Sequence, residues 1–288
     1  MLLLLETVSC TRSAVPYPGA VLPSTLTAAA VVTRAPRPPY SGQLASEIPY
    51  AVIGIHQDDL LTVRPVAGVE GAASGTLGFD QRDIAVTGQQ TALGSSIWVE
   101  VVRNDGGTGW VNIQNLTEEA AASAFCADPR VLQVLDAVTK AVASRDGKAL
   151  SALTSPRRGL RIRMDWRGPE VAYTPDEVRT LMQAPTAVDW GPNPSGAKVE
   201  GSFKQVVLPL LDQVLGPQSV LTCDVLGTGS VLREVRWPSE YANLNYYSFY
   251  RPAEGGGSEF SWITWAVGVE YVQGQPYLAA LVLIRAGI

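Results

Sequence analysis

The sequence predicts a mainly β first part, a small β-barrel over about residues 47–117, followed by an α+β domain over residues 118–288. Three observations predict this fold class. A hairpin signal joins two β-rich runs in the first part, capped helical patterns follow it, and two long apolar strand patterns close the chain. Helices that precede a run of strands are typical of an α+β layer arrangement, so we expect a curved antiparallel sheet with covering helices.

Length and charge limit the class of protein. At 288 residues the chain exceeds one typical domain. Its 22 Lys and Arg against 27 Asp and Glu give a net charge of -5, without a run of five basic residues. Nucleic-acid binding requires a concentrated basic face, so we expect no nucleic-acid partner. The nearest basic cluster, residues 157–163, is expected to form a strand with one charged, solvated face.

Short β-rich runs in the first part have to close onto one another. Residues 50–55 and 60–63 are apolar strand patterns, and residues 97–102 and 108–113 alternate around Asn-Asp-Gly-Gly at 104–107. Asn, Asp and Gly tolerate the positive φ that tight hairpin turns require. Strands this short are not stable singly, and closure into a barrel removes exposed edges.

This order of runs resembles a bacterial Src-homology-3-like (SH3-like) domain, a module used mostly outside the cytoplasm. The resemblance covers about residues 47–117 and implies an extracytoplasmic protein. It also implies that the barrel recognises a cell-wall peptide or glycan, or an envelope protein, through a shallow aromatic groove. The candidate ligand-binding residues are Tyr50, Asp58, Trp98 and Trp110, and one of the two tryptophans is expected in the core.

Residues 1–46 have the composition of an extended tether. Leucines at 2–5 followed by Ser9 and Cys10 resemble the end of a bacterial lipoprotein signal, which implies that Cys10 is lipidated. The alternative is a short disordered leader with an incidental cysteine. After Cys10, Pro, Ala, Ser and Thr dominate without a periodic apolar pattern. No stretch approaches the roughly 18 apolar residues of a membrane span, so we expect membrane contact only through a lipid anchor.

The cysteine count bears on the same question. Cys10, Cys126 and Cys223 are the three cysteines of the chain. An odd count in a secreted protein requires an explanation, and one lipidated cysteine plus a disulfide between Cys126 and Cys223 accounts for all three. The alternative is two buried free thiols, which are common in a cytosolic core.

Local signals place helices and strands in the second part. Asp128 before Pro129 is an N-cap with Pro at the first helical position, and Thr174 opens a capping box. The expected helices are residues 128–145, 149–153, 174–182 and 202–215, the last bent or split by Pro209, and the expected strands are residues 260–272 and 276–285. The second strand is apolar on both faces, so both have to be covered.

The second part resembles an uncharacterised domain that follows such barrels in bacterial envelope proteins. The residues that carry this resemblance are 153–156, 189–191, 195–196 and 271–278. The first helix, followed by residues 149–150 and 155–156, is also similar to the opening of nuclear-transport-factor-like folds. Neither resemblance implies an activity.

Histidine provides the main exclusion among enzymes. His56, in the predicted barrel, is the only histidine of the chain. Zinc amidases need several His ligands and cysteine peptidases need a His base, so the sequence excludes both classes for this chain. It also lacks the common metal, redox and phosphate-loop motifs. We therefore expect neither a cofactor nor a metal site.

A glycosidase is harder to exclude, because it needs only two carboxylates about 5 to 9.5 Å apart. Glu270 stands out, since it lies on the mixed face of a predicted strand. No pair has a diagnostic spacing. The available carboxylates are Asp165, Glu170, Asp189, Glu240, Glu254, Glu259 and Glu270.

The sequence favours a non-enzymatic, extracytoplasmic binding protein that is either lipid-anchored or secreted. Two alternatives stay open. One is a cell-wall glycoside hydrolase with a carboxylate pair in the second part, which would require two carboxylates facing each other in one cleft. The other is a structural scaffold that pairs with another protein, which predicts an exposed apolar patch in place of a pocket.

Overall fold

The computed structural model describes residue 44 and residues 46–193, 195–231, 234–253 and 258–286, which all belong to one compact unit, Ala35–Ile288. Cys10 and most of the expected tether lie outside the described residues. Within the described ranges, every helix is too short or too polar to cross a bilayer.

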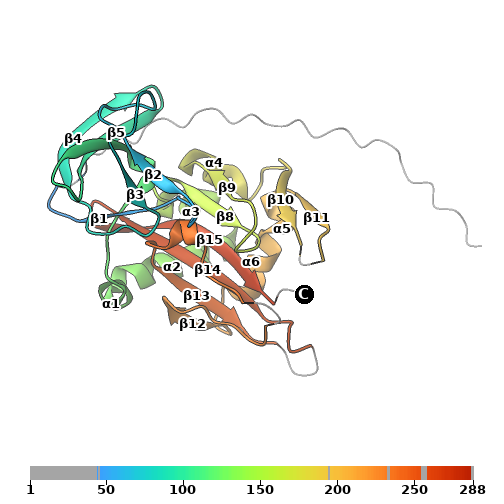
Figure 1. The fold of residues 1–288 in the computed structure, drawn as a ribbon. Helices are drawn as coiled ribbons and strands as arrows, with labels where there is room; N and C mark the ends of the chain where they lie inside the picture. Colours follow the sequence, from blue (N-terminus) through green and yellow to red (C-terminus); the bar gives the residue numbers. More distant parts are fainter. Residues whose placement is uncertain (1–43, 45, 194, 232–233, 254–257, 287–288) are drawn as a thin grey trace, which may run out of the picture. The chain divides into compact units, whose positions relative to one another are not determined.

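The first part consists of short antiparallel strands, drawn in blue to green in Figure 1. They pair as β1–β7, β2–β3 and β4–β5–β6. The elements are β1 (Tyr50–Val52), β2 (Leu60–Val63), β3 (Gly75–Gly78), β4 (Val86–Leu93), β5 (Ser96–Val102), β6 (Thr108–Asn112), a 3-10 turn η1 (Ile113–Asn115) and β7 (Leu116–Glu118). The expected hairpin is present as β5–β6, with Gly106 at φ 81° in its turn.

The strand ladders of the first part do not close into a barrel within the described residues. Three open sheets surround one apolar core and are joined by single bridges, Tyr50 with Ile84 and Arg64 with Trp110. Two features interrupt the ladders. The segment between β2 and β3 contains Pro65, which lacks a backbone donor, and the β4–β5 register shifts between Val86 and Gln90.

The second part contains helices and a six-stranded sheet, in the strand order β12–β13–β14–β15–β8–β9. The helices are α1 (Ala122–Ala127), α2 (Pro129–Ser144), α3 (Gly147–Leu153), α4 (Pro175–Leu181), α5 (Phe203–Val206) and α6 (Leu208–Val214), with a 3-10 turn η2 (Ser239–Tyr241). The sheet strands are β8 (Leu160–Arg163), β9 (Val171–Tyr173), β12 (Val220–Cys223), β13 (Tyr246–Arg251), β14 (Ile263–Val272) and β15 (Gln275–Arg285). A separate hairpin pairs β10 (Val188–Pro192) with β11 (Lys198–Gly201).

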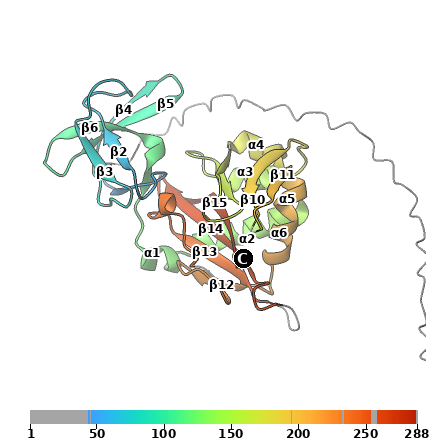
Figure 2. The ribbon, with the colours of Figure 1, turned by 45° about the vertical axis from the view of Figure 1, so that its right-hand side comes forward.

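The mixed α+β character of the second part is confirmed, with one difference in the sheet. Four of its strand pairs are antiparallel, whereas β15 and β8 run parallel. Figure 2 shows β13, β14 and β15 as adjacent strands of one twisted layer. The β14–β15 register shifts between Gly268 and Val269, a bulge of the kind that bends a strand pair.

Both faces of this sheet are buried, as the apolar pattern of the last strand predicts. Trp265 and Leu281 lie in the core that includes the inner faces of the helices. On the opposite face, Val282 packs with Trp262 and with Ile53, which follows β1 of the first part. The first part therefore contributes directly to the covering of the sheet.

The predicted helix signals are confirmed by the contacts that the structure records. The Asp128 side chain accepts a hydrogen bond from the backbone N–H of Arg130 at the start of α2. Capping boxes open α4 at Thr174 and α5 at Ser202. The helix expected over 202–215 is split into α5 and α6, because Pro209 cannot continue the hydrogen-bond ladder.

The prediction of a solvated charged strand at residues 157–163 is wrong. Arg157, Arg158 and Arg163 are all buried. Each lies within ion-pair distance of a carboxylate, which compensates for the loss of water around the guanidinium group.

Candidate functional site

The first and second parts meet through hydrogen bonds between side chains and backbone. The Asn243 side chain donates to the carbonyl of Val52 at 2.8 Å, and the Gln114 side chain donates to the carbonyl of Arg157 at 2.8 Å. Such contacts satisfy backbone groups that are buried at the junction. We therefore expect the two parts to move as one body.

A buried ion pair lies at the centre of this junction. Arg158 Nε donates to Glu270 Oε2 at 2.7 Å, and the exposed fractions of the two side chains are 5% and 0%. The Ser155 hydroxyl donates to the other Glu270 oxygen. Arg158 also donates to the carbonyls of Gln114 and Leu116, both at 2.9 Å. Burial lowers the pKa of the Arg158 guanidinium, and the Glu270 carboxylate opposes this shift.

A second buried pair extends this network toward the surface. Arg157 Nη2 lies 3.6 Å from Glu118 Oε1, with side chains 1% and 3% exposed. Glu118 also accepts the backbone N–H groups of Gln273 and Gly274, at 2.6 and 2.9 Å. We call Glu118, Ser155, Arg157, Arg158 and Glu270 the buried charge cluster.

The turn that docks on Glu118 has a shape that few sequences permit. Gln273 and Gly274 connect β14 to β15 and both have positive φ, 54° and 70°. Such a two-residue turn matches the twist of the flanking strands. It also directs two consecutive N–H groups to one carboxylate, and this carboxylate fixes the turn against β7.

A cavity of about 490 Å³ opens beside this turn; we call it the junction pocket. Its wall combines the end of β7 and the linker after it (residues 118–121), α1, the first residues of α2, Tyr271 and Gly274, with Ile48 at one side. Ile48, Phe125 and the alanines at 120, 121, 124 and 127 make most of this wall apolar. Small alanine side chains leave the space that a larger side chain would fill.

The polar rim of the junction pocket is a chain of three side chains. Arg130 donates to both Asp128 oxygens, with Nη2 at 2.7 Å from Oδ2, and Nη1 donates to the carbonyl of Gly274 at 3.0 Å. The Tyr271 hydroxyl donates to Asp128 Oδ2 at 2.9 Å. The rim thus joins the start of α2 to the β14–β15 hairpin.

The hydrogen bonds of this rim shift the pKa values of Asp128 and Tyr271. The bonds from Arg130 hold the pKa of the Asp128 carboxyl at about 2, below its ordinary value of 3.8. Burial, together with the hydrogen bond to Asp128, raises the pKa of the Tyr271 hydroxyl. Asp128 is therefore charged and Tyr271 is neutral at physiological pH.

We expect the stability of the Asp128→Asn variant to decrease less than that of the wild type as the pH is lowered from about 4 to about 2. The folded pKa of Asp128 lies below its unfolded value, so the stabilisation is complete above about pH 4 and is lost as the pH falls through about 2. Urea midpoints measured between pH 2 and pH 5 check this. If the urea midpoints of the wild type and the variant changed with pH in the same way, the lowered pKa of Asp128 would be contradicted.

The residues expected to line a groove in the first part are dispersed. Tyr50 is 0% exposed and belongs to the apolar core, so it is a core residue and not part of a surface groove. Trp98 is 7% exposed and Trp110 is half-buried, which gives the expected division into one core and one more accessible tryptophan. Asp58 is exposed and lies 3.3 Å from His56 Nδ1. No recorded contact joins Asp58 to Trp110 among the described residues.

The carboxylates proposed for a glycosidase are engaged in other contacts. Glu270 belongs to the buried charge cluster, and Asp189 lies 3.4 Å from Lys198 Nζ. Glu170 and Glu240 share the guanidinium of Arg163, at 3.8 and 2.9 Å. The remaining three are Asp165, which accepts the N–H of Arg167, Glu259, which accepts the Ser230 hydroxyl, and Glu254, which lies outside the described residues.

The acidic groups that do line the junction pocket are also engaged. Glu118 is held in the buried charge cluster, and Glu119 accepts the backbone N–H of Asp83 at 2.8 Å. A glycosidase acid needs a raised pKa, whereas the pKa of Asp128 is lowered to about 2. Asp128 therefore does not match the general acid of that chemistry.

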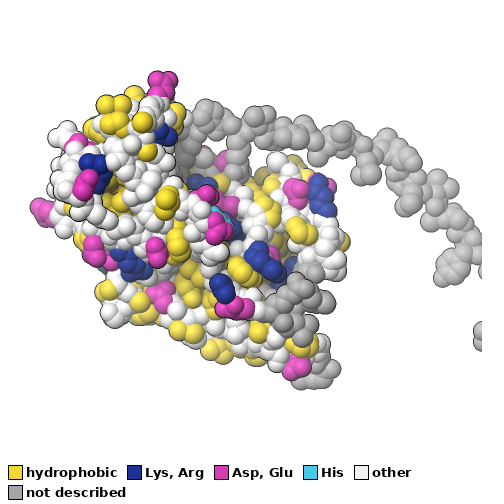
Figure 3. Space-filling model, viewed as in Figure 1, with side chains coloured by type: hydrophobic (Ala, Val, Ile, Leu, Met, Phe, Trp, Pro, Cys, Tyr) yellow, Lys and Arg dark blue, Asp and Glu magenta, His cyan; other side chains and the backbone are white. Residues whose placement is uncertain are grey.

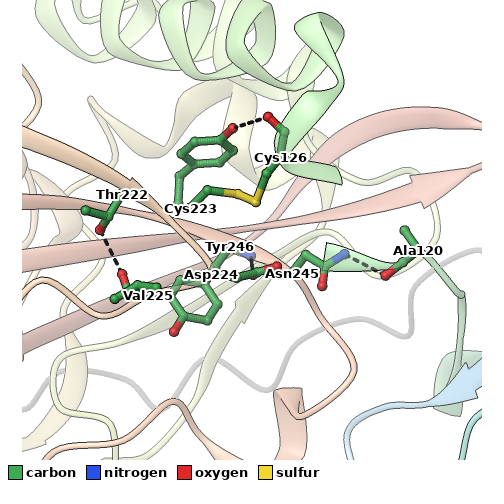
Figure 4. Close-up of a disulfide and its surroundings, with 9 residues drawn as sticks. Ala120, Cys126, Thr222, Cys223, Asp224, Val225, Asn245 and Tyr246 are labelled. Carbon is green, nitrogen blue, oxygen red and sulfur yellow. Dashed lines mark hydrogen bonds between the residues drawn. A yellow bond between two sulfur atoms is a disulfide. The ribbon is translucent and has the colours of Figure 1, made fainter. Parts of the chain in front are cut away.

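A disulfide joins α1, which lines the junction pocket, to β12 at the sheet edge (Figure 4). It connects Cys126 and Cys223, whose Cα atoms are 5.8 Å apart. The Tyr247 hydroxyl donates to the carbonyl of Cys126 at 3.2 Å. These two contacts hold the six-residue helix α1 on the sheet.

Sequence reasoning missed the junction pocket because its residues look unremarkable along the chain. Residues 116–123 have the pattern of a short junction between the two parts, and Asp128 that of a helix cap only. The available signal was the run of alanines that precedes the cap, together with the Gly-containing turn at 273–275. Their proximity depends on the fold, since 143 residues separate Asp128 from Tyr271.

Comparison of the chain with protein-family models finds no match, and comparison with curated proteins finds none either. The functional assignment therefore depends on the geometry of the junction pocket and on the residues around it.

Proposed function

We propose that this chain is a non-enzymatic binding protein of the bacterial envelope whose ligand occupies the junction pocket. The single observation that carries the proposal is a cavity of about 490 Å³ with an apolar wall and one charged rim. Small-ligand sites in proteins typically measure about 300–1,000 Å³ and combine an apolar lining with a few placed polar groups.

The proposal includes an SH3-like character for the first part. The β5–β6 hairpin and the single apolar core enclosed by β1 to β7 support this assignment. In this proposal the first part does not bind the ligand in a surface groove of its own, because Tyr50 is buried and Trp98 is only 7% exposed. Instead, its last strand supplies Glu118 and one wall of the junction pocket.

An extracytoplasmic location is part of the proposal and is supported by the disulfide. Disulfides persist mainly in oxidising compartments, and the Cys126–Cys223 pair leaves Cys10 as the one remaining cysteine. We propose that Cys10 anchors the chain to a membrane through a lipid. The alternative is secretion without an anchor.

The proposed ligand is a short peptide or glycan unit of the cell wall, and nucleic acid is not proposed. On the face shown in Figure 3, acidic and basic side chains are interspersed. The net charge of -5 likewise does not favour a polyanion. The rim at Arg130 and Asp128 offers both a cationic and an anionic group to the polar ends of such a ligand.

Filling the junction pocket tests the proposal. The Ala124→Trp variant places a large side chain on the exposed wall of α1, and we expect it to abolish co-sedimentation with purified cell-wall sacculi. Ala92→Trp, at an exposed position of β4, is the matched control and should bind like the wild type.

Two outcomes would count against the proposal. If both tryptophan variants co-sediment like the wild type, the wall ligand does not use the junction pocket. If the wild type itself stays in the supernatant, the assignment of a wall ligand fails.

A further inference from the structure

Three potential metal-binding groups lie together at the edge of the sheet. The Sγ atoms of Cys126 and Cys223 and a carboxylate oxygen of Asp224 lie within 4.8 Å of one another. Cys126 comes from α1, Cys223 is the last residue of β12, and Asp224 follows it (Figure 4). Two sulfurs and one carboxylate oxygen form a donor set suited to zinc.

Asp224 provides a second, independent observation. Its Oδ1 accepts the backbone N–H of Tyr246 at 2.8 Å, and its own N–H donates to the Tyr246 carbonyl at 2.9 Å. Its Oδ2 is buried and has no hydrogen-bond partner among the described residues. A buried carboxylate oxygen without a partner is costly, and an ion is one of the groups that relieves this cost.

The local backbone fixes this carboxylate beside the cysteine pair. Asp224 has a positive φ of 48°, a conformation that non-glycine residues rarely adopt. The two hydrogen bonds with Tyr246 hold it there. These contacts hold the Asp224 carboxylate close to the two cysteine sulfurs.

We propose that Cys126, Cys223 and Asp224 bind one zinc ion after a dithiol has opened the disulfide. The dithiol supplies two electrons and two protons and is itself oxidised to a disulfide, and the S–S bond of the protein becomes two thiols. Zinc then displaces the two thiol protons and bonds to both sulfurs and to Asp224 Oδ2. Water occupies the fourth position, because three protein ligands are available.

Replacing the disulfide by a zinc ion would keep α1 linked to β12 in both the oxidised and the reduced protein. In the oxidised protein the disulfide ties α1 to β12, and in the reduced protein the zinc ion ties the same two elements. Since α1 lines the junction pocket, that wall stays attached to the sheet in both states.

Cobalt titration of the full chain tests the inference, since Co²⁺ reports thiolate ligands by absorption. The Cys10→Ala protein is reduced with dithiothreitol, freed of it by gel filtration under inert gas, and titrated with Co²⁺. We expect one equivalent to bind with a sulfur-to-cobalt charge-transfer band that Zn²⁺ abolishes. The oxidised protein should lack this band, and it is a control that needs no substitution in the site.

Variants separate the role of Asp224 from that of the sulfurs. Asp224→Asn should weaken Co²⁺ binding about tenfold or more, since even the loss of an outer-shell partner of a metal ligand typically costs that much. The exposed control Asp136→Asn should leave the affinity unchanged. Zn²⁺ should also raise the urea midpoint of the reduced protein.

Either of two results would overturn the inference. If the reduced protein shows no sulfur-to-cobalt charge-transfer band, the two cysteine sulfurs do not bind the metal. If the reduced wild type and the reduced Asp224→Asn variant bind Co²⁺ with equal affinity, Asp224 is not a ligand.

Discussion

Replacing Glu270 by alanine is expected to lower the free energy of unfolding by about 3–5 kcal/mol, the usual cost of leaving a buried charge without its partner. Arg158 would remain in the junction with its side chain 5% exposed and without its carboxylate. The loss should appear as a reduced urea midpoint, followed by circular dichroism and by tryptophan fluorescence.

Second variants make this prediction specific. The combined substitution of Arg158→Met with Glu270→Leu should recover part of the loss, because both charges are removed together. Recovery should be incomplete, since the carbonyls of Gln114 and Leu116 lose their donors. Glu234→Ala removes an exposed carboxylate and should leave the midpoint unchanged. A loss below about 1 kcal/mol for Glu270→Ala would show that the pair is solvated.

Removing the disulfide is expected to have the second large effect, about 2–5 kcal/mol. Cys126 and Cys223 are 97 residues apart, so the bond closes a long loop in the unfolded chain. In a Cys10→Ala background, the variant with both cysteines replaced by alanine should unfold at lower urea than its oxidised parent.

The same comparison contains its own control. Reduction by a dithiol should lower the midpoint of the parent toward that of the double variant and leave the double variant unaffected. A titration of free thiols should find none in the oxidised, unfolded parent. Two reactive thiols and identical midpoints would show that the cysteines are not bonded.

Local signals in the sequence predicted helices α2 to α6 and the last two strands of the second part, but not strands β9 to β13. Thr174 and Ser202 open helices because the residues that complete their capping boxes are only three positions away. Pro209 divides a helix for an equally local reason. The apolar pattern of β15 predicted its burial on both faces, because period and composition are visible in one segment.

Apart from the Cys126–Cys223 disulfide, the sequence did not predict contacts between distant segments. Arg158 and Glu270 are 112 positions apart, so neither residue alone indicates that it is buried. The parallel pairing of β15 with β8 depends on a connection that returns across the chain, and strand patterns carry no information on direction. Tyr50 and Trp110 look alike as aromatic residues in strands, but the first is in the core and the second half-buried.

The junction pocket depends on such distant contacts throughout. Its wall combines β7, α1, α2 and the β14–β15 hairpin, and Glu118 holds this hairpin in place. A binding site made in this way is specified by the fold and not by a motif. This explains why the ligand-binding candidates chosen from the sequence, Tyr50, Asp58, Trp98 and Trp110, lay in the first part alone.

The most direct test of this account is a backbone NMR titration of the folded chain with soluble muropeptides released from purified cell wall. We expect shift changes to cluster at residues 118–130 and at 271–274, with little change around Asp58 and Trp110. Changes centred on Asp58 and Trp110, or no saturable change at any residue, would contradict ligand binding at the junction pocket.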